Sequence, residues 1–187
     1  MIGLADGASK TGDKRAEYYK NRIKQHAELY GKSHCHALEV VLNLLYTGDV
    51  AQTRIARQLA RYGLSPSGFN ILSILNNFKT TGCQLHELGE LLVVSRANIT
   101  GVVDSLEQRG LAERVADKED RRVRIARITA EGAALVESIL PSHYAEIQEM
   151  CATLTDSEMT LVSELLTRLR HCIQNSDSNE GQRKKIK

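Results

Sequence analysis

The sequence has no tryptophan, few aromatic residues and no long apolar run. Aromatic side chains make up 4% of its 187 residues. No stretch of about 18 apolar residues occurs, which is the length that a membrane-spanning helix needs. Residues 1–15 also lack the apolar centre of a signal peptide. We therefore expect a cytoplasmic protein with no membrane partner.

Cysteine pairs and catalytic motifs are also missing. The four cysteines, Cys35, Cys83, Cys151 and Cys172, include no C-x-x-C pair. This spacing does not suggest a disulfide scaffold or a structural zinc site. The chain contains no Gly-rich phosphate loop, no nucleophile elbow and no H-E-x-x-H. We therefore expect no enzymatic activity, no cofactor and no metal.

Net charge is close to balanced, so nucleic-acid binding would depend on where the charges lie. The formal net charge is +2, from 25 Lys and Arg against 23 Asp and Glu. Between Ser95 and Arg127 we count eight basic and six acidic residues. A local excess of two is too small to bind a polyanion by bulk charge. Any nucleic-acid binding by this segment must therefore depend on the order of its residues.

The segment 95–132 reads as a helix, a hairpin with a charged tip, and the start of another helix. Ser95 is a good N-cap, and Gly110 is a typical helix stop. An apolar stripe between them leaves polar side chains free on the opposite face. Alternating residues over 111–115 and 123–128 predict two strands joined by a turn that carries Asp120-Arg121-Arg122. A helix followed by a basic-tipped hairpin is the winged helix-turn-helix arrangement.

The order of these motifs resembles the MarR family of bacterial transcription regulators. Gln84–Leu92 resembles the supporting helix, and Ser95–Thr100 the start of the recognition helix. The sequence D-x-x-D-R-R at 117–122, followed by Ile128-Thr129-Ala130-Glu131-Gly132, resembles the wing and the helix after it. The likeness extends more loosely over about 38–173. It implies a mainly α fold with a small β-hairpin wing, dimerised through its N- and C-terminal helices.

The resemblance also implies double-stranded DNA as partner and assigns contacts to it. Ser95 and Thr100 would reach phosphates, while Arg96 and Asn98 would reach base edges, since Arg suits guanine and Asn suits adenine. Arg122, with Arg121 beside it, would make the wing contact, and Gln84 could donate to a phosphate. A winged helix used only for protein contacts is the open alternative.

The remaining sequence predicts how the chain is divided. We expect a disordered N-terminus over 1–14, an extra helix over 15–31, a MarR-like domain over 32–174 and a disordered basic tail over 175–187. Within the domain, helices over 33–62 and 130–174 would dimerise, and residues 65–129 would form the DNA-binding lobe. The apolar stripes of the terminal helices have no evident partner in a small winged-helix core. A homodimer would cover them, and packing within one chain is the alternative.

A small-molecule effector is the expected signal. The resemblance implies an aromatic or phenolic compound in a cleft, and His36, Tyr46, Phe69 and Asn70 are our candidates to line it. The extra helix resembles a branch that responds to urate, but that branch uses a Trp that this chain lacks. Two other sensors stay open. Cys35 could be a redox switch, and the cluster of His26, His34, Cys35 and His36 could bind a metal.

Overall fold

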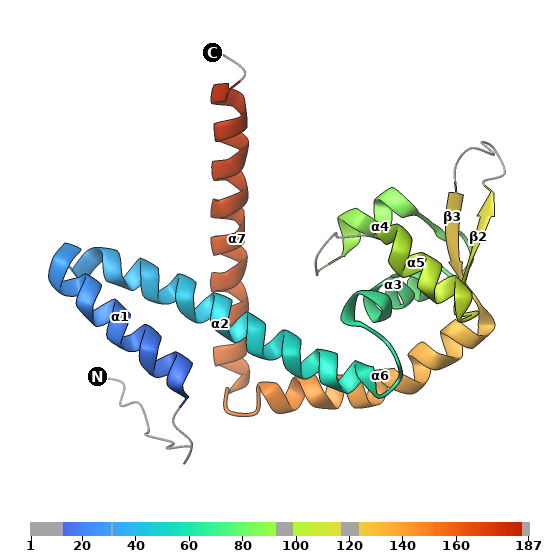
Figure 1. Cartoon of the computed structure of the whole chain (residues 1–187), viewed down its shortest axis with the longest axis horizontal. Coiled ribbons are helices and arrows are strands. Elements are labelled where there is room, and N and C mark those ends of the chain that lie inside the picture. The colour runs from blue at the N-terminus through green and yellow to red at the C-terminus, as the bar shows by residue number, and fades with distance from the viewer. Residues whose placement is uncertain (1–12, 31, 93–98, 117–123, 185–187) are drawn as a thin grey trace. The chain divides into compact units, whose positions relative to one another are not determined.

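The computed structural model describes residues 13–30, 32–92, 99–116 and 124–184. It divides into two compact units, one ending at Arg57 and the other beginning at Gln58. The second helix runs across this boundary. We describe each unit by itself. Figure 1 shows the elements in chain order, from α1 at the N-terminus to α7 at the C-terminus.

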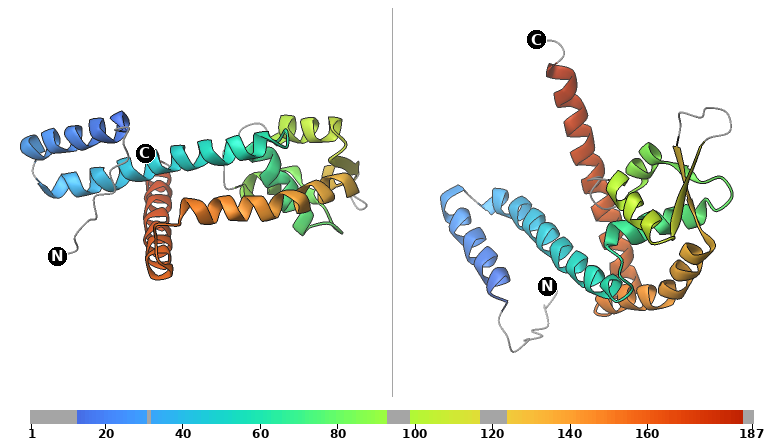
Figure 2. Two further views of the ribbon diagram at one scale, coloured as in Figure 1. Left: turned by 90° about the horizontal axis from the view of Figure 1, so that it is seen from below. Right: turned by 45° about the vertical axis from the view of Figure 1, so that its right-hand side comes forward.

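The first unit is a helical hairpin. It contains α1 (Lys14–Tyr30) and most of α2 (Lys32–Ala60), which run side by side (Figures 1 and 2). Asp13 caps α1, because its carboxylate accepts from the backbone N–H groups of Arg15 and Ala16 at 3.1 and 3.2 Å. The expected extra N-terminal helix is therefore present. None of the described side chains of this unit is buried.

The second unit holds the winged-helix lobe. Its elements are α3 (Pro66–Asn77), β1 (Cys83–Gln84), α4 (Leu85–Leu91), α5 (Ile99–Gln108), β2 (Ala112–Ala116) and β3 (Arg124–Ile128). Ser65 caps α3 by accepting from the N–H of Gly68 at 3.0 Å, and Pro66 occupies the first helical position. The strands form an antiparallel sheet in the order β1-β3-β2. The predicted mainly α fold with a small β-hairpin wing is confirmed.

Strand β1 was not predicted from the sequence. β1 has two residues, Cys83 and Gln84, which pair with Ala126 and Ile125 of β3. Two residues are too few for a period-2 pattern to be recognised. This strand places the start of α4 at the edge of the sheet.

The core lies within the lobe and the first half of α6 (Ala130–Met150). Its largest fully buried side chains come from five helices: Leu59, Ile71, Leu72, Leu75, Leu88, Val103, Val136 and Ile139. Thr129 caps α6 by accepting from the N–H of Gly132 at 3.0 Å. Pro141 lies inside α6, which continues through it to Met150. The lobe thus closes its own core with α6.

The last helix, α7, spans Asp156–Lys184. Thr155 caps its start, since its hydroxyl accepts from the N–H of Glu158 at 3.3 Å. The side chain of Glu158 accepts in return from the N–H of Thr155 at 2.8 Å. We expected disorder from residue 175, but the helix continues to Lys184. This stretch contains no proline, and Glu180, Gln182, Arg183 and Lys184 near its end are good helix formers. Among the described helices, none is both long and apolar enough to cross a membrane.

Candidate nucleic-acid interface

The helix-turn-helix is formed by α4 and α5, which pack closely. A Cβ at Gly89 of α4 would lie 2.8 Å from the Cδ1 of Ile99 in α5, so a larger residue there would require the Ile99 side chain to shift. Val103 and Leu106 bury one face of α5 in the lobe. Thr100, in its first turn, is exposed. The free face of α5 can therefore meet a partner while the buried face holds the helix in place.

The wing strands are joined to α5 by one arginine. Arg114 of β2 places its guanidinium 2.5 Å from a carboxylate oxygen of Asp104 and 2.5 Å from one of Glu107, both on α5. It also donates to the carbonyl oxygen of Thr100 at 3.1 Å. The backbone N–H of Arg114 donates to Glu107 at 2.7 Å. These contacts hold the β2–β3 hairpin against α5. The two elements lie next to each other in Figure 1.

A second arginine also forms hydrogen bonds within the lobe. Arg109, just after α5, donates to the carbonyl oxygens of Gly63 at 2.6 Å and Tyr62 at 3.3 Å. These carbonyls follow the end of α2, where a cation is favourable for the helix dipole. Arg109 and Arg114 therefore serve the fold. The positive charge that would contact DNA must come from other residues of this segment.

The base of the hairpin is anchored to α6. The hydroxyl of Thr129 donates to the carbonyl oxygen of Gly110 at 2.7 Å, and its N–H donates to that of Leu111 at 3.2 Å. A Cβ at Gly132 would lie 2.0 Å from the carbonyl oxygen of Leu111. Only glycine permits this approach. The Thr129-x-x-Gly132 motif thus seats the wing on the first turn of α6.

The structure covers part of the predicted DNA contact set. Gln84 precedes α4, is half-buried, and donates its backbone N–H to Glu87 at 2.9 Å. Thr100 is exposed on α5. The other five predicted contacts, Ser95, Arg96, Asn98, Arg121 and Arg122, lie outside the described residues. Gln84 and Thr100 both belong to the helix-turn-helix.

The predicted effector residues fall in separate units. His36 is exposed and Tyr46 is half-buried on α2, in the first unit. Phe69 is 3% exposed and Asn70 is half-buried on α3, in the second unit. The four residues therefore form no single site within either unit.

A polar cluster around His143 was not predicted. Its Nδ1 lies 3.0 Å from the Oε1 of buried Gln58, and its ring packs edge-on against Phe69 with centroids 4.8 Å apart. The hydroxyl of Ser142 lies 3.1 Å from that of Tyr62. Desolvation lowers the pKa of His143, although Glu146 opposes this shift. The cluster joins the end of α2 to α6. No local pattern predicts it, because its partners are about 80 residues apart.

The cysteines of the described chain differ in environment. Cys83 is buried, and desolvation, with a hydrogen bond to Glu87, raises the pKa of its thiol to about 11. At neutral pH this thiol stays protonated and is a poor nucleophile. Cys151 is half-buried and Cys172 is exposed. The side chain of Cys35 lies outside the described residues. Within the part of the chain described, no three His, Cys, Asp or Glu side chains gather to hold a metal.

A helix-turn-helix whose second helix is fixed to an antiparallel wing defines a winged-helix DNA-binding protein. Comparison with known proteins identifies the family. Residues 64–123 match the sequence model of the MarR family. The HTH-type transcriptional regulator MhqR of Bacillus subtilis is 36% identical over 113 residues, which are 60% of this chain and 77% of that protein. The HTH-type transcriptional repressor YetL of the same species is 31% identical over 148 residues, covering 79% and 88%.

The solved structures agree on the fold. The structure of Bordetella bronchiseptica BpsR superposes with a TM-score of 0.62 at 23% identity and covers 68% of this chain and 89% of that one. The chain belongs to the MarR family and is a transcriptional regulator of the MarR type. Its relatives are regulators and not enzymes.

Proposed function

We propose that the protein is a cytoplasmic repressor that binds a pseudo-palindromic operator as a homodimer and leaves it when a small aromatic acid or phenol binds. The observation that carries the proposal is the attachment of the wing to α5 through Arg114, with Asp104 and Glu107 at 2.5 Å. Two DNA-reading elements held in one arrangement can contact a groove and a neighbouring phosphate together. YetL, a relative over most of the chain, is named a repressor.

The proposed DNA contacts are those assigned from the sequence. Arg96 and Asn98 read base edges, and Ser95, Thr100 and Gln84 bind phosphates. Arg121 and Arg122 form the wing contact. Since Arg109 and Arg114 are paired within the lobe, the wing-tip arginines supply the cations there. Mobility shift with the DNA upstream of the protein's own gene tests the proposal. Absence of any shift, with a folded dimer, would favour a protein-interaction module instead.

The wing contact has a quantitative test. Arg122→Ala should weaken binding to all DNA sequences alike and leave folding unchanged. It should also lower the log–log slope of affinity against salt by about one unit for each phosphate that the protein no longer neutralises, so about two for a dimer. Wild-type affinity and slope in Arg122→Ala would exclude this contact. Arg109→Ala is the matched control, because it should lower thermal stability without lowering the salt slope.

The homodimer is proposed from exposed apolar side chains on the terminal helices. On α7, Leu161, Leu165 and Ile173 are 54%, 48% and 51% exposed. They follow one another at spacings of four and eight residues, so they share a helix face. Covering such a face stabilises an assembly. The two recognition helices of the dimer would then meet successive major grooves about 34 Å apart. Light scattering that shows a stable monomer with unchanged DNA binding would refute the dimer.

The effector is proposed from the family and from BpsR, whose DNA binding is regulated by 6-hydroxynicotinic acid. His36, Tyr46, Phe69 and Asn70 remain the proposed lining. A ligand can shift the DNA-binding equilibrium only by its differential affinity, typically about 1–3 kcal/mol. Salicylate-like acids should therefore raise thermal stability and weaken DNA binding together.

The matched variant for the effector test replaces all four cysteines with Ser. Aromatic acids should act on it as on the wild type. If peroxide and no aromatic acid releases the DNA, and the cysteine-free variant does not respond, the protein is a redox switch centred on Cys35.

A further inference from the structure

The N-terminal helical hairpin contains a pocket of its own. It has a volume of about 280 Å³ and lies between α1 and α2, entirely within the first unit. This is near the lower limit of sites that bind small molecules. Eight side chains from the two helices line it: Ala16, Tyr19, Lys20, Ile23, Glu39, Leu42, Asn43 and Tyr46. None of them was assigned to DNA binding, and Tyr46 alone was an effector candidate.

The pocket has an apolar floor and a polar rim. Tyr19, Ile23, Leu42 and Tyr46 are half-buried, and the rings of the two tyrosines lie 6.2 Å apart. Lys20, Glu39 and Asn43 are exposed. Among the described residues, no ion pair joins Lys20 to Glu39. An aromatic floor with one cation and one anion at the rim is a set of groups that could bind a flat ligand carrying both charges.

One side of the pocket is braced by polar contacts. Arg15 forms an ion pair with Asp49 at 2.6 Å and lies over the ring of Tyr46, 5.1 Å from its centroid. The hydroxyl of Tyr46 donates to the carboxylate of Asp13. This hydrogen bond lowers the pKa of Asp13 and raises that of Tyr46. The start of α1 is thereby tied to α2, and the ring of Tyr46 is held against the pocket.

We propose that this pocket binds a small zwitterionic aromatic molecule, such as an aromatic amino acid. The ring would lie on the floor against Tyr19 and Tyr46, where offset or edge-on contacts between aromatic rings are favourable. The carboxylate would pair with Lys20 and the ammonium with Glu39, and Asn43 could hydrogen-bond to either group. The proposal goes beyond the regulatory function proposed above, because it assigns a different class of ligand to a pocket of the first unit that shares only Tyr46 with the proposed effector lining.

The absence of tryptophan from the chain gives a direct measurement. Because the protein has no Trp, indole emission in a mixture comes from the added probe alone. L-tryptophan carries both charges, indole-3-acetate keeps only the carboxylate, and tryptamine keeps only the ammonium. Fluorescence anisotropy of each probe, titrated with the full-length protein, should show that L-tryptophan binds most tightly. Each missing charge should weaken binding about two- to fivefold, as expected for a partly exposed ion pair.

Two variants assign the charges to their partners. Lys20→Met should weaken L-tryptophan and indole-3-acetate about two- to fivefold and leave tryptamine unchanged. Glu39→Gln should weaken L-tryptophan and tryptamine to a similar extent and leave indole-3-acetate unchanged. This crossed pattern would not arise from a general loss of folding. Circular dichroism melts of both variants should match the wild type, since both side chains are exposed.

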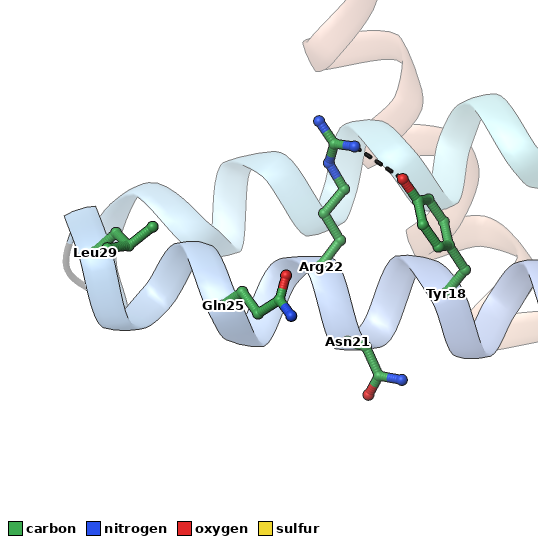
Figure 3. A pocket seen from close by; sticks show the side chains of 5 residues that line it. All are labelled: Tyr18, Asn21, Arg22, Gln25 and Leu29. Carbon is green, nitrogen blue, oxygen red and sulfur yellow. Dashed lines mark hydrogen bonds between the residues drawn. The ribbon is translucent and has the colours of Figure 1, made fainter.

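The controls lie on another face of α1. A separate pocket there is lined by Tyr18, Asn21, Arg22, Gln25 and Leu29 (Figure 3). In it, Arg22 donates to the hydroxyl of Tyr18 at 2.9 Å. Arg22→Met removes a cation from the same helix without touching the proposed site. Glu28→Gln is the matched loss of an anion. Neither control should change the affinity for any of the three probes.

Three results would overturn the proposal. The first is no rise in anisotropy with any probe, and the second is equal weakening by the control variants and the pocket variants. The third is a change of molecular mass in light scattering for Lys20→Met or Glu39→Gln without a change in probe affinity. That result would assign the pocket to a contact between two copies. No DNA is used in these measurements, so their failure would not count against the proposed repressor function.

Discussion

The lobe that would read DNA and the helices that flank it bury their apolar residues differently. In the lobe and the first half of α6, Ile71, Leu72 and Val136 are fully buried. In α2 and α7, Leu45 and Leu165 remain 64% and 48% exposed. Burying a large apolar side chain is worth about 1.5–3 kcal/mol. The lobe therefore has its own source of stability, whereas exposed apolar residues such as Leu45 and Leu165 would stabilise the protein only when a partner covers them.

This difference separates the two tasks of a regulator. A rigid lobe presents α5 and the wing in one arrangement, and Arg114 and Thr129 maintain it. Flanking helices with open faces can pack against a second chain, and their packing can respond to a ligand. Substitutions in the lobe should therefore change its stability, and substitutions on the open faces should change assembly.

The largest effect is expected at Gly132. Gly132→Ala would place a Cβ 2.0 Å from the carbonyl oxygen of Leu111, so the hairpin base must shift away from α6. We expect a loss of about 3 kcal/mol in the free energy of unfolding, which denaturant titration would measure. Gly48→Ala in α2 is the control, because nothing lies within 4 Å of its added Cβ. There the better helix propensity of Ala should stabilise by up to about 1 kcal/mol. Equal effects of the two substitutions would contradict the difference between the regions.

The next effect concerns the open face of α7. Leu165→Glu should raise the dissociation constant of the dimer about ten- to hundredfold, because a carboxylate would replace an apolar contact at the proposed interface. Analytical ultracentrifugation over a concentration series would measure it. Glu164→Gln, its neighbour on another face of the helix, should leave the dimer unchanged. A dimer that tolerates Leu165→Glu must use a different surface.

The starts of helices α3, α6 and α7 and the three strands show how much of the fold the sequence could predict. Ser65, Thr129 and Thr155 are N-cap residue types that can be seen in the sequence, and the structure places each at a helix start, because a cap is a local interaction within four residues. The β2 and β3 strands were found from their alternation. The two-residue β1 strand and the helix beyond residue 175 were not. β1 exists only through its pairing with β3, and no local pattern encodes that pairing.

A smaller effect is expected at Arg114. Arg114→Gln removes the cation that lies between Asp104 and Glu107, while the backbone bond from residue 114 to Glu107 can persist. Since the two carboxylates are partly exposed, water screens them, and we expect a loss of about 1 kcal/mol in unfolding free energy. DNA affinity should fall by more than this stability loss explains, because the wing loses its fixed position on α5. If affinity is unchanged, the wing does not depend on this contact.

The sequence predicted which kind of site this is, but it did not predict several of the contacts within it. The motif from Asp117 to Gly132 indicated the family correctly, and the structure explains one of its residues, since only glycine fits at position 132. Arg109 and Arg114 are among the eight basic residues counted between Ser95 and Arg127, yet both bond within the lobe. Their hydrogen-bond and ion-pair partners come from other elements, so these contacts can be seen only in the three-dimensional structure. The polar cluster at His143 was missed for the same reason.

The smallest effect is the pH dependence at His143. Desolvation lowers the pKa of His143 in the folded protein below its ordinary value of about 6.5, so the unfolded chain binds the proton more readily. As pH falls from about 6.5 towards the folded pKa, the unfolded state gains protons first and stability declines; above and below this window the contribution is constant. His143→Gln should remove this part of the decline in denaturant titrations at stepped pH. His86→Gln, at an exposed residue of α4, should keep it. The same slope in wild type and His143→Gln would mean that the ring is as hydrated in the fold as in the unfolded chain, and that Phe69 and Gln58 do not shield it from water.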